Sequence, residues 1–152
     1  MPDYSSSLQQ FQNIYLTLHI ATICLSYIAF FVASVAAVLY LIQDNLLKNK
    51  QVGIALNRLP NLFFLDKLNY RAIGSGFPIL TLSIIIGFIW AKHIRGASWS
   101  YNPREVYSLV LWLMYALILH VRLSSKLRGT KVAQLSLVAF CLVIFTLFST
   151  CR

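Results

Sequence analysis

The chain has 152 residues, of which 59% are hydrophobic and 11% are charged, and its mean hydropathy is +0.71. Soluble domains are typically about 45–50% apolar and about 25% charged, so this composition argues against a soluble domain and indicates a membrane protein. The formal net charge of +9 is not taken as a sign of nucleic-acid binding, because basic residues between hydrophobic spans usually set topology and contact anionic lipid headgroups.

The N-terminal segment and the cysteines carry no processing or metal signal. The first fifteen residues contain neither Lys nor Arg, whereas a secretory signal peptide needs a basic start, so we interpret them as a lead into the first span. Cys24, Cys141 and Cys151 form no CxxC pair, which excludes the usual zinc and thioredoxin-like patterns. A CxxCH sequence is also absent, so the chain is not itself a c-type cytochrome.

Four segments are apolar enough to cross a bilayer as helices, which takes about 20 residues each. We therefore predict an all-α, polytopic membrane protein that forms a single membrane domain over residues 1–152. The expected spans are about 16–42, 73–91, 106–121 and 132–150.

The segment between the first two spans alternates apolar and polar residues, and Pro60 is a suitable helix start. We expect a short amphipathic helix here that lies on the cytoplasmic surface of the membrane. The second span then opens with Gly74, Gly76 and Pro78, and Gly87 follows further along. Small residues let membrane helices approach closely, so these positions are interpreted as packing features.

Basic residues predict the orientation, because cytoplasmic loops are enriched in Lys and Arg. Nine of them flank or lie in the first and third connections, and four lie in the connection at 90–105 or at the C-terminus. We therefore expect both termini and the 90–105 loop to face outward from a bacterial inner (cytoplasmic) membrane.

The loop WAKHIRGASWSYNPRE, residues 90–105, contains two Trp, a Tyr, a His, three basic residues and the chain's only Glu. A connector between spans needs only to be short and polar. Flat aromatic faces interleaved with cations suit a flat, anionic, aromatic ligand, and haem is the obvious candidate. Its NPRE end also has a structural explanation as a helix start, with Asn102 as the cap, Pro103 in the first turn and Glu105 at the positive helix end.

Two histidines fall within the spans, where an ionisable side chain is a functional candidate by default. His19 lies near the outer end of the first span and His120 near the inner end of the third. Most of the bilayer separates them, so they would ligate two different haem irons rather than one. A hydrogen bond to a neighbouring helix is the alternative role for each. No Ser/His/Asp arrangement, carboxylate pair or Gly-rich phosphate loop is present.

The chain resembles the CcsA/ResC/HemX family of haem-handling cytochrome c assembly proteins over about residues 17–148. The resemblance is carried by LHIATICLSYIAFFVASVAAVLYLIQ, LPNLFFLDKLNYRAIGSGFPILTLSIIIGFIWA, the 90–105 loop and VYSLVLWLMYALILHVRL. The loop falls where the family carries its tryptophan-rich motif, approximately WGxxWxWDPKE.

The resemblance implies that His19 is an axial ligand to haem b held at the loop, and that His120 belongs to a second haem position in the membrane. Loop residues implied to contact the haem are Trp90, Arg95, Trp99, Tyr101, Asn102 and Arg104. Four of these depart from the motif, since Arg95 and Tyr101 replace Trp, Asn102 replaces Asp and Arg104 replaces Lys. A second outward histidine and further N-terminal spans, which family members usually have, are not in this sequence.

The favoured function is a membrane component of cytochrome c maturation that binds or presents haem for attachment to apocytochrome c. Any lyase activity would belong to a complex. The missing haem ligands leave three accounts open: a fragment of a longer protein, a subunit completed by another membrane subunit, or a member that no longer ligates haem. Two alternatives stay open at this stage: a HemX-like regulator of haem biosynthesis, and a structural interaction subunit that ligates no haem of its own.

Overall fold

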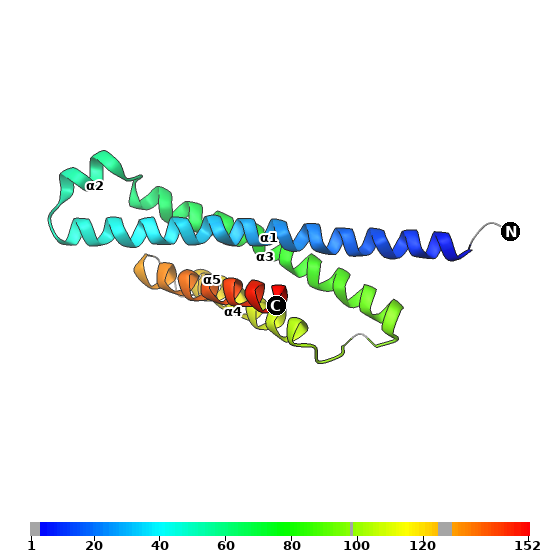
Figure 1. The fold of residues 1–152 in the computed structure, drawn as a ribbon. Helices are drawn as coiled ribbons and strands as arrows, with labels where there is room; N and C mark the ends of the chain where they lie inside the picture. The colour runs from blue at the N-terminus through cyan, green and yellow to red at the C-terminus, as the bar shows by residue number, and fades with distance from the viewer. Residues whose placement is uncertain (1–3, 98, 125–128) are drawn as a thin grey trace.

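The computed structural model describes residues 4–97, 99–124 and 129–152 of the chain. Five helices follow one another: α1 (Tyr4–Lys48), α2 (Val52–Arg58), α3 (Leu62–Arg95), α4 (Pro103–Ser124) and α5 (Thr130–Cys151) (Figure 1). Within those described ranges, all of these helices except α2 are long and apolar enough to cross a membrane. The prediction of an all-α, polytopic membrane protein is therefore confirmed.

All four spanning helices are longer than the spans that the sequence predicted, and α1 and α3 exceed them most. α1 has 45 residues, which corresponds to about 68 Å at 1.5 Å per residue, more than twice the roughly 30 Å of a hydrocarbon core. Its first turns extend past the rest of the bundle (Figure 1). The hydropathy signal marked only the membrane-embedded part of a helix that continues in both directions.

The prediction of a short, separate surface helix after Pro60 is wrong. The chain does form a helix there, but it is the start of α3, which continues unbroken from Leu62 to Arg95. Asn61 begins it, because its side chain accepts a hydrogen bond from the Phe63 backbone N–H at 3.3 Å. Leu65 and Asn69 are buried against other helices, and these contacts hold the segment in line with the span.

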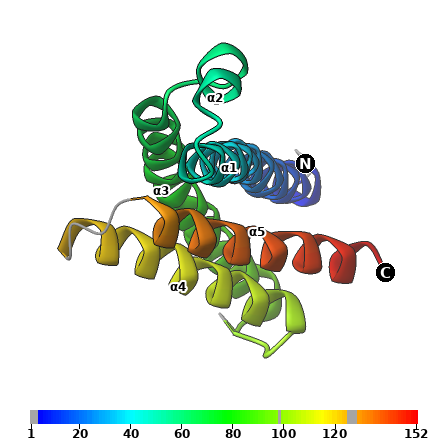
Figure 2. The same cartoon turned by 90° about the vertical axis from the view of Figure 1, so that its left-hand side faces the viewer.

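The helices form two layers, one of α1 and α3 and one of the antiparallel hairpin of α4 and α5 (Figures 1 and 2). The closest approach of α1 to α3 depends on Gly76, where an added Cβ would lie 2.8 Å from a ring carbon of Phe30. Gly74 has open space around it instead. The predicted packing role therefore holds for Gly76 and not for Gly74.

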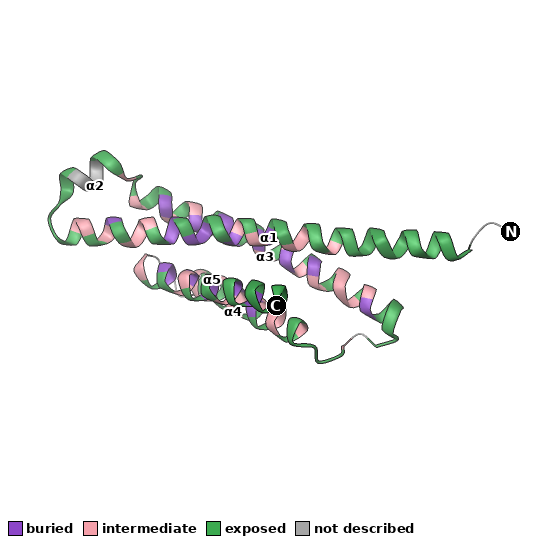
Figure 3. Cartoon of the chain, viewed as in Figure 1, coloured by how far each residue is buried: buried purple, intermediate pink, exposed green. Residues whose placement is uncertain are grey.

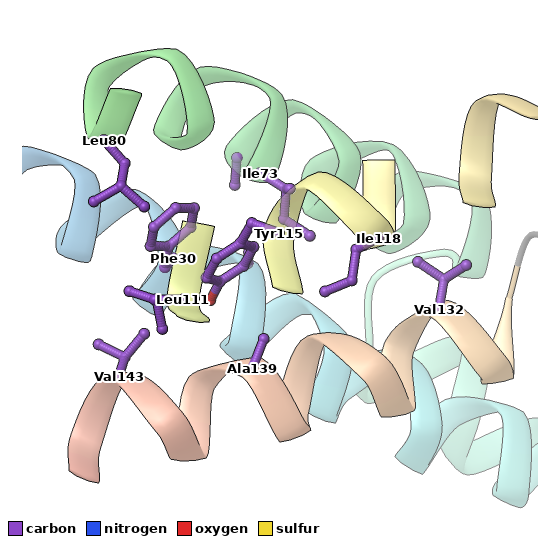
Figure 4. Packing of buried hydrophobic residues seen from close by; sticks show 11 residues of the cluster. Phe30, Ile73, Leu80, Leu111, Tyr115, Ile118, Val132, Ala139 and Val143 are labelled. Atoms are coloured by element: carbon purple, nitrogen blue, oxygen red, sulfur yellow. The ribbon is translucent and has the colours of Figure 1, made fainter. Parts of the chain in front are cut away.

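The core lies where the two layers meet. The rings of Phe30 in α1 and Tyr115 in α4 stack with centroids 3.6 Å apart and planes 6° from parallel. Aliphatic side chains from α3, α4 and α5 surround this pair (Figure 4). The outward faces of the helices are largely exposed and carry many large apolar side chains (Figure 3), which suits a surface in contact with lipid.

One group of polar contacts joins the last turns of α1 and α4 to the first turns of α3 and α5, at the end of the bundle that we call the basic end. The Asn69 side-chain amide donates to the Ala33 carbonyl at 2.7 Å and to the Ser136 hydroxyl at 3.3 Å. Arg122 in α4 forms an ion pair with Asp66 in α3 at 2.7 Å. These contacts join α3 to the other three spanning helices.

Candidate functional site

A cavity of about 740 Å³ opens at the opposite end, which we call the loop end because residues 96–102 lie there. Side chains from all four spanning helices and from the loop line it, and most of them are apolar. Small-molecule and cofactor sites typically occupy about 300–1,000 Å³ with apolar walls and a few polar groups, so this cavity has the size of a ligand site. The predicted site residues that line it are His19, Trp90, Arg95, Trp99, Asn102 and Arg104.

His19 is half-buried in this cavity and is bonded to α3 through one ring nitrogen. Its Nδ1 lies 2.8 Å from the Ser83 backbone carbonyl oxygen. A carbonyl oxygen only accepts, so this contact requires a proton on Nδ1, and in a neutral ring Nε2 then keeps its lone pair. In the described part of the chain, Nε2 has no hydrogen-bond partner. Metal-bound histidines usually donate their other ring N–H to a carbonyl or carboxylate in this way.

Aromatic side chains form one wall of the cavity. The Trp99 ring lies 5.8 Å from that of Phe88, and Tyr101 packs edge-on against Trp99 at 5.9 Å. Tyr101 itself is 82% exposed and does not line the cavity, so it supports Trp99 rather than facing a ligand. The indole N–H of Trp90 is buried without a hydrogen-bond partner among the described residues, which leaves one donor in the wall for a ligand.

The two arginines at the cavity differ in how far their charges are neutralised. Arg95 forms an ion pair with Glu105 at 3.0 Å and donates to the Ser100 hydroxyl at 2.6 Å. Arg104 is exposed and donates to the Thr150 carbonyl at 3.4 Å, and within the described residues it has no acidic partner. Arg104 is therefore the better candidate to bind an anionic group of a ligand. The sequence alone does not distinguish it from Arg95.

Glu105 organises the loop. It stands before the expected membrane segment 106–121, and its carboxylate accepts from the Ser100 N–H at 3.0 Å and the Ser100 hydroxyl at 3.1 Å. The Ser100 N–H, together with the Ser100 hydroxyl and Arg95, holds the pKa of Glu105 below its usual value. The carboxylate therefore stays ionised and fixes the loop against the start of α4.

The expected helix start at Asn102 is right in position and wrong in detail. α4 begins at Pro103, and the Asn102 backbone carbonyl accepts from the N–H groups of Glu105 and Val106. The Asn102 side chain does not cap the helix, however. It donates to the Ser100 hydroxyl at 2.9 Å, because the Glu105 carboxylate already draws Ser100 toward the helix start.

His120 lies elsewhere. It is exposed on α4 and does not line the cavity with His19, in keeping with the separation expected from the sequence. Its role in a second haem position stays a prediction.

Sequence reasoning missed Ser83 and Gly87, which meet the His19 ring from α3. From the sequence, Gly87 is expected only to help helices pack together. The available signal was the spacing of two small residues one helical turn apart, which places them on one face of a helix. Thr146 and Thr150 of α5 also line the cavity, and no sequence pattern marks them as site residues.

Comparison with known proteins shows the family of this chain. Residues 1–151 match the family model described as cytochrome C assembly protein. The chain is 37% identical over 134 residues to cytochrome c biogenesis protein CcsA of Chlamydomonas reinhardtii, covering 88% of this chain and 37% of that protein. It is 35% identical over 147 residues to CcsA of Guillardia theta, covering 85% of this chain and 48% of that one.

A third relative, CcsA of Thermosynechococcus vestitus, is 46% identical over 87 residues, which is 57% of this chain and 27% of the relative. The chain thus spans between about a quarter and a half of the length of these curated relatives. No solved structure matches it. The family match over nearly the whole chain, together with the four membrane-spanning helices, shows that this protein belongs to the cytochrome c assembly family.

Proposed function

We propose that this protein is a membrane component of cytochrome c maturation that holds haem b in the loop-end cavity and presents it for attachment to apocytochrome c. The observation that carries the proposal is the state of His19. Its Nδ1 is bonded to α3, and its Nε2 keeps a lone pair at a cavity of about 740 Å³. Membership of the cytochrome c assembly family supports the same ligand class.

The other groups at the cavity fit the remaining chemistry of haem. Trp99 and Phe88 offer aromatic faces to a porphyrin, and the apolar side chains of α1 and α3 exclude water from it. The Arg104 guanidinium and the unpartnered Trp90 N–H are donors for the propionate groups. As cargo, haem brings the vinyl groups that the cysteine thiols of a CxxCH segment in apocytochrome c would attack.

We further propose that the second axial ligand comes from another membrane subunit or segment. Among the cavity-lining residues that the structure describes, His19 is the only imidazole and no Cys or Met accompanies it. No group of three metal-ligating side chains occurs in the described ranges either. One ligand from this chain leaves a coordination position open, which suits a protein that must later release its haem to a partner.

The test is haem binding by the purified chain in detergent. Wild type should bind haem with a Soret band typical of a single histidine ligand, and added imidazole should convert it to a six-coordinate, low-spin spectrum. His19→Ala should abolish this binding. His93→Ala is the matched control, because it removes an exposed histidine of the 90–105 segment that does not line the cavity. No Soret band in wild type at saturating haem, or equal loss in both variants, would contradict the proposal.

The proposed orientation places both termini and the loop end outside a bacterial cytoplasmic membrane. The excess of Lys and Arg at the basic end supports it. Cys151 offers a direct test because it is exposed at the end of α5. A membrane-impermeant maleimide added to intact cells should label Cys151, and should not label Lys131→Cys in a Cys151→Ser background. The opposite labelling pattern would invert the topology.

A further inference from the structure

The His19 ring rests directly on the backbone of α3 at Gly87. A Cβ added at position 87 would lie 2.8 Å from Cε1 of His19 and 3.2 Å from its Nδ1. The first of these is shorter than real Cβ contacts, so any side chain at position 87 would push the ring away. The imidazole can therefore keep its present position only while residue 87 is glycine.

The same missing side chain gives His19 access to its hydrogen-bond acceptor. Ser83 lies one turn before Gly87 on the same face of α3, and in an α-helix its carbonyl pairs with the N–H of residue 87. A carbonyl oxygen has two lone pairs, so it can accept a second bond from the side. His19 Nδ1 approaches this oxygen to 2.8 Å. The Ser83 hydroxyl donates in return to the His19 carbonyl at 3.3 Å and ties the two helices together.

This arrangement decides which nitrogen of His19 is free. The neutral imidazole carries one proton, and the second ring nitrogen is the one that can bind a metal. The bond to the Ser83 carbonyl places the proton on Nδ1 and leaves Nε2 as the ligand. We propose that Gly87 and the Ser83 carbonyl are positioning residues, which hold the His19 ring and fix its Nδ1–H form so that Nε2 binds the haem iron. The inference rests on the proposed function, since it assigns how that ligand is prepared.

The other glycines of α3 supply a matched series. At Gly76 an added Cβ would also lie 2.8 Å from a side chain of α1, but that side chain is Phe30 in the core. At Gly74 an added Cβ would meet nothing within 4 Å. Gly87→Ala, Gly76→Ala and Gly74→Ala therefore make the same chemical change against His19, against a core ring and against open space.

The first measurement is haem affinity of the full chain in detergent. Gly87→Ala should weaken binding about 10- to 100-fold, the usual effect of disturbing a group that orients a metal ligand. Gly76→Ala should lower the melting temperature but leave the haem affinity of the folded protein near that of wild type, and Gly74→Ala should change neither. Equal haem affinity for Gly87→Ala and Gly74→Ala would overturn the inference. Weaker binding by Gly76→Ala to the same extent as by Gly87→Ala would also overturn it, because the effect would then be general helix packing.

The second measurement needs no haem. Nitrogen NMR of the ligand-free protein with ¹⁵N-labelled histidine reports which ring nitrogen is protonated, and His19→Ala identifies the His19 signals. Wild-type His19 should show the Nδ1–H form, Gly76→Ala should keep it, and Gly87→Ala should lose it. An Nε2–H form in wild type would overturn the inference. Failure of wild type to bind haem would instead refute the proposed function, and the NMR result would still decide whether α3 sets the protonation of His19.

A double variant covers the case in which Gly87→Ala does not fold. If the added methyl acts by displacing the His19 ring, removing the ring should make the methyl harmless. His19→Ala combined with Gly87→Ala should then melt at the same temperature as His19→Ala alone. A further large drop in the melting temperature of the double variant would show that the methyl disturbs α3 by another route, and the positioning role of Gly87 would be rejected.

Discussion

The two ends of this bundle use polar groups in opposite ways. At the basic end, Asp66 pairs with Arg122, and Asn69 bonds to α1 and α5, around a cavity of only about 10 Å³. At the loop end the same four helices leave about 740 Å³ and a histidine with one nitrogen unused. Polar groups in a membrane are expensive, so an ion pair is explained by structure, whereas a half-paired histidine at a cavity of ligand size calls for a ligand. Variants at the basic end should therefore change stability, and variants at the loop end should change binding.

The largest effect on stability is expected from Arg122→Ala. Only 8% of the Arg122 side chain and 19% of the Asp66 side chain are exposed, so the change leaves a largely buried carboxylate without its cation. Breaking a buried pair from one side typically lowers the free energy of unfolding by about 3 to 5 kcal/mol. Unfolding in mixed micelles measures it, with exposed Arg71→Ala as the control. A loss below about 1 kcal/mol would place the pair with ordinary surface ion pairs.

A smaller loss is expected from Asn69→Ala, which removes hydrogen bonds from α3 to both α1 and α5. Hydrogen bonds between membrane helices contribute about 0.6 to 1.7 kcal/mol each, so the loss of two should lower the free energy of unfolding by about 1 to 3 kcal/mol in the same assay. Haem affinity should not change, because Asn69 lies at the other end of the bundle from the cavity. A Soret titration that weakened in step with stability would show that the two ends are coupled.

The smallest effect separates the two arginines of the loop end. Arg104→Gln should weaken haem binding by a few-fold, and more so at low salt, because its charge has no acidic partner among the described residues. Arg95→Gln should weaken haem binding less than Arg104→Gln, since Glu105 already neutralises the charge of Arg95. Haem dimethyl ester, which lacks the propionate charges, supplies the control, and it should bind Arg104→Gln and wild type equally. A deficit that persisted with the ester would assign Arg104 a structural role.

The sequence predicted the parts of this molecule that depend on local composition. Apolar runs located all four spanning helices, and the mixture of Trp, Arg and His at 90–105 located the cavity's loop wall. It failed where contacts between distant segments decide the outcome. The pattern after Pro60 predicts a short surface helix, but burial of Leu65 and Asn69 makes that segment part of α3. Gly87 looked like general packing because only the fold places His19 against it, 68 residues earlier in the chain.

The central claim is that His19 Nε2 in the loop-end cavity is the iron ligand that this chain supplies. Chemical rescue tests it most directly, because free imidazole can bind the iron in place of a deleted histidine side chain. His19→Gly should lose tight haem binding and should regain saturable binding when millimolar imidazole is added, whereas His93→Gly should need no rescue. Full haem binding by His19→Gly without imidazole would contradict the account.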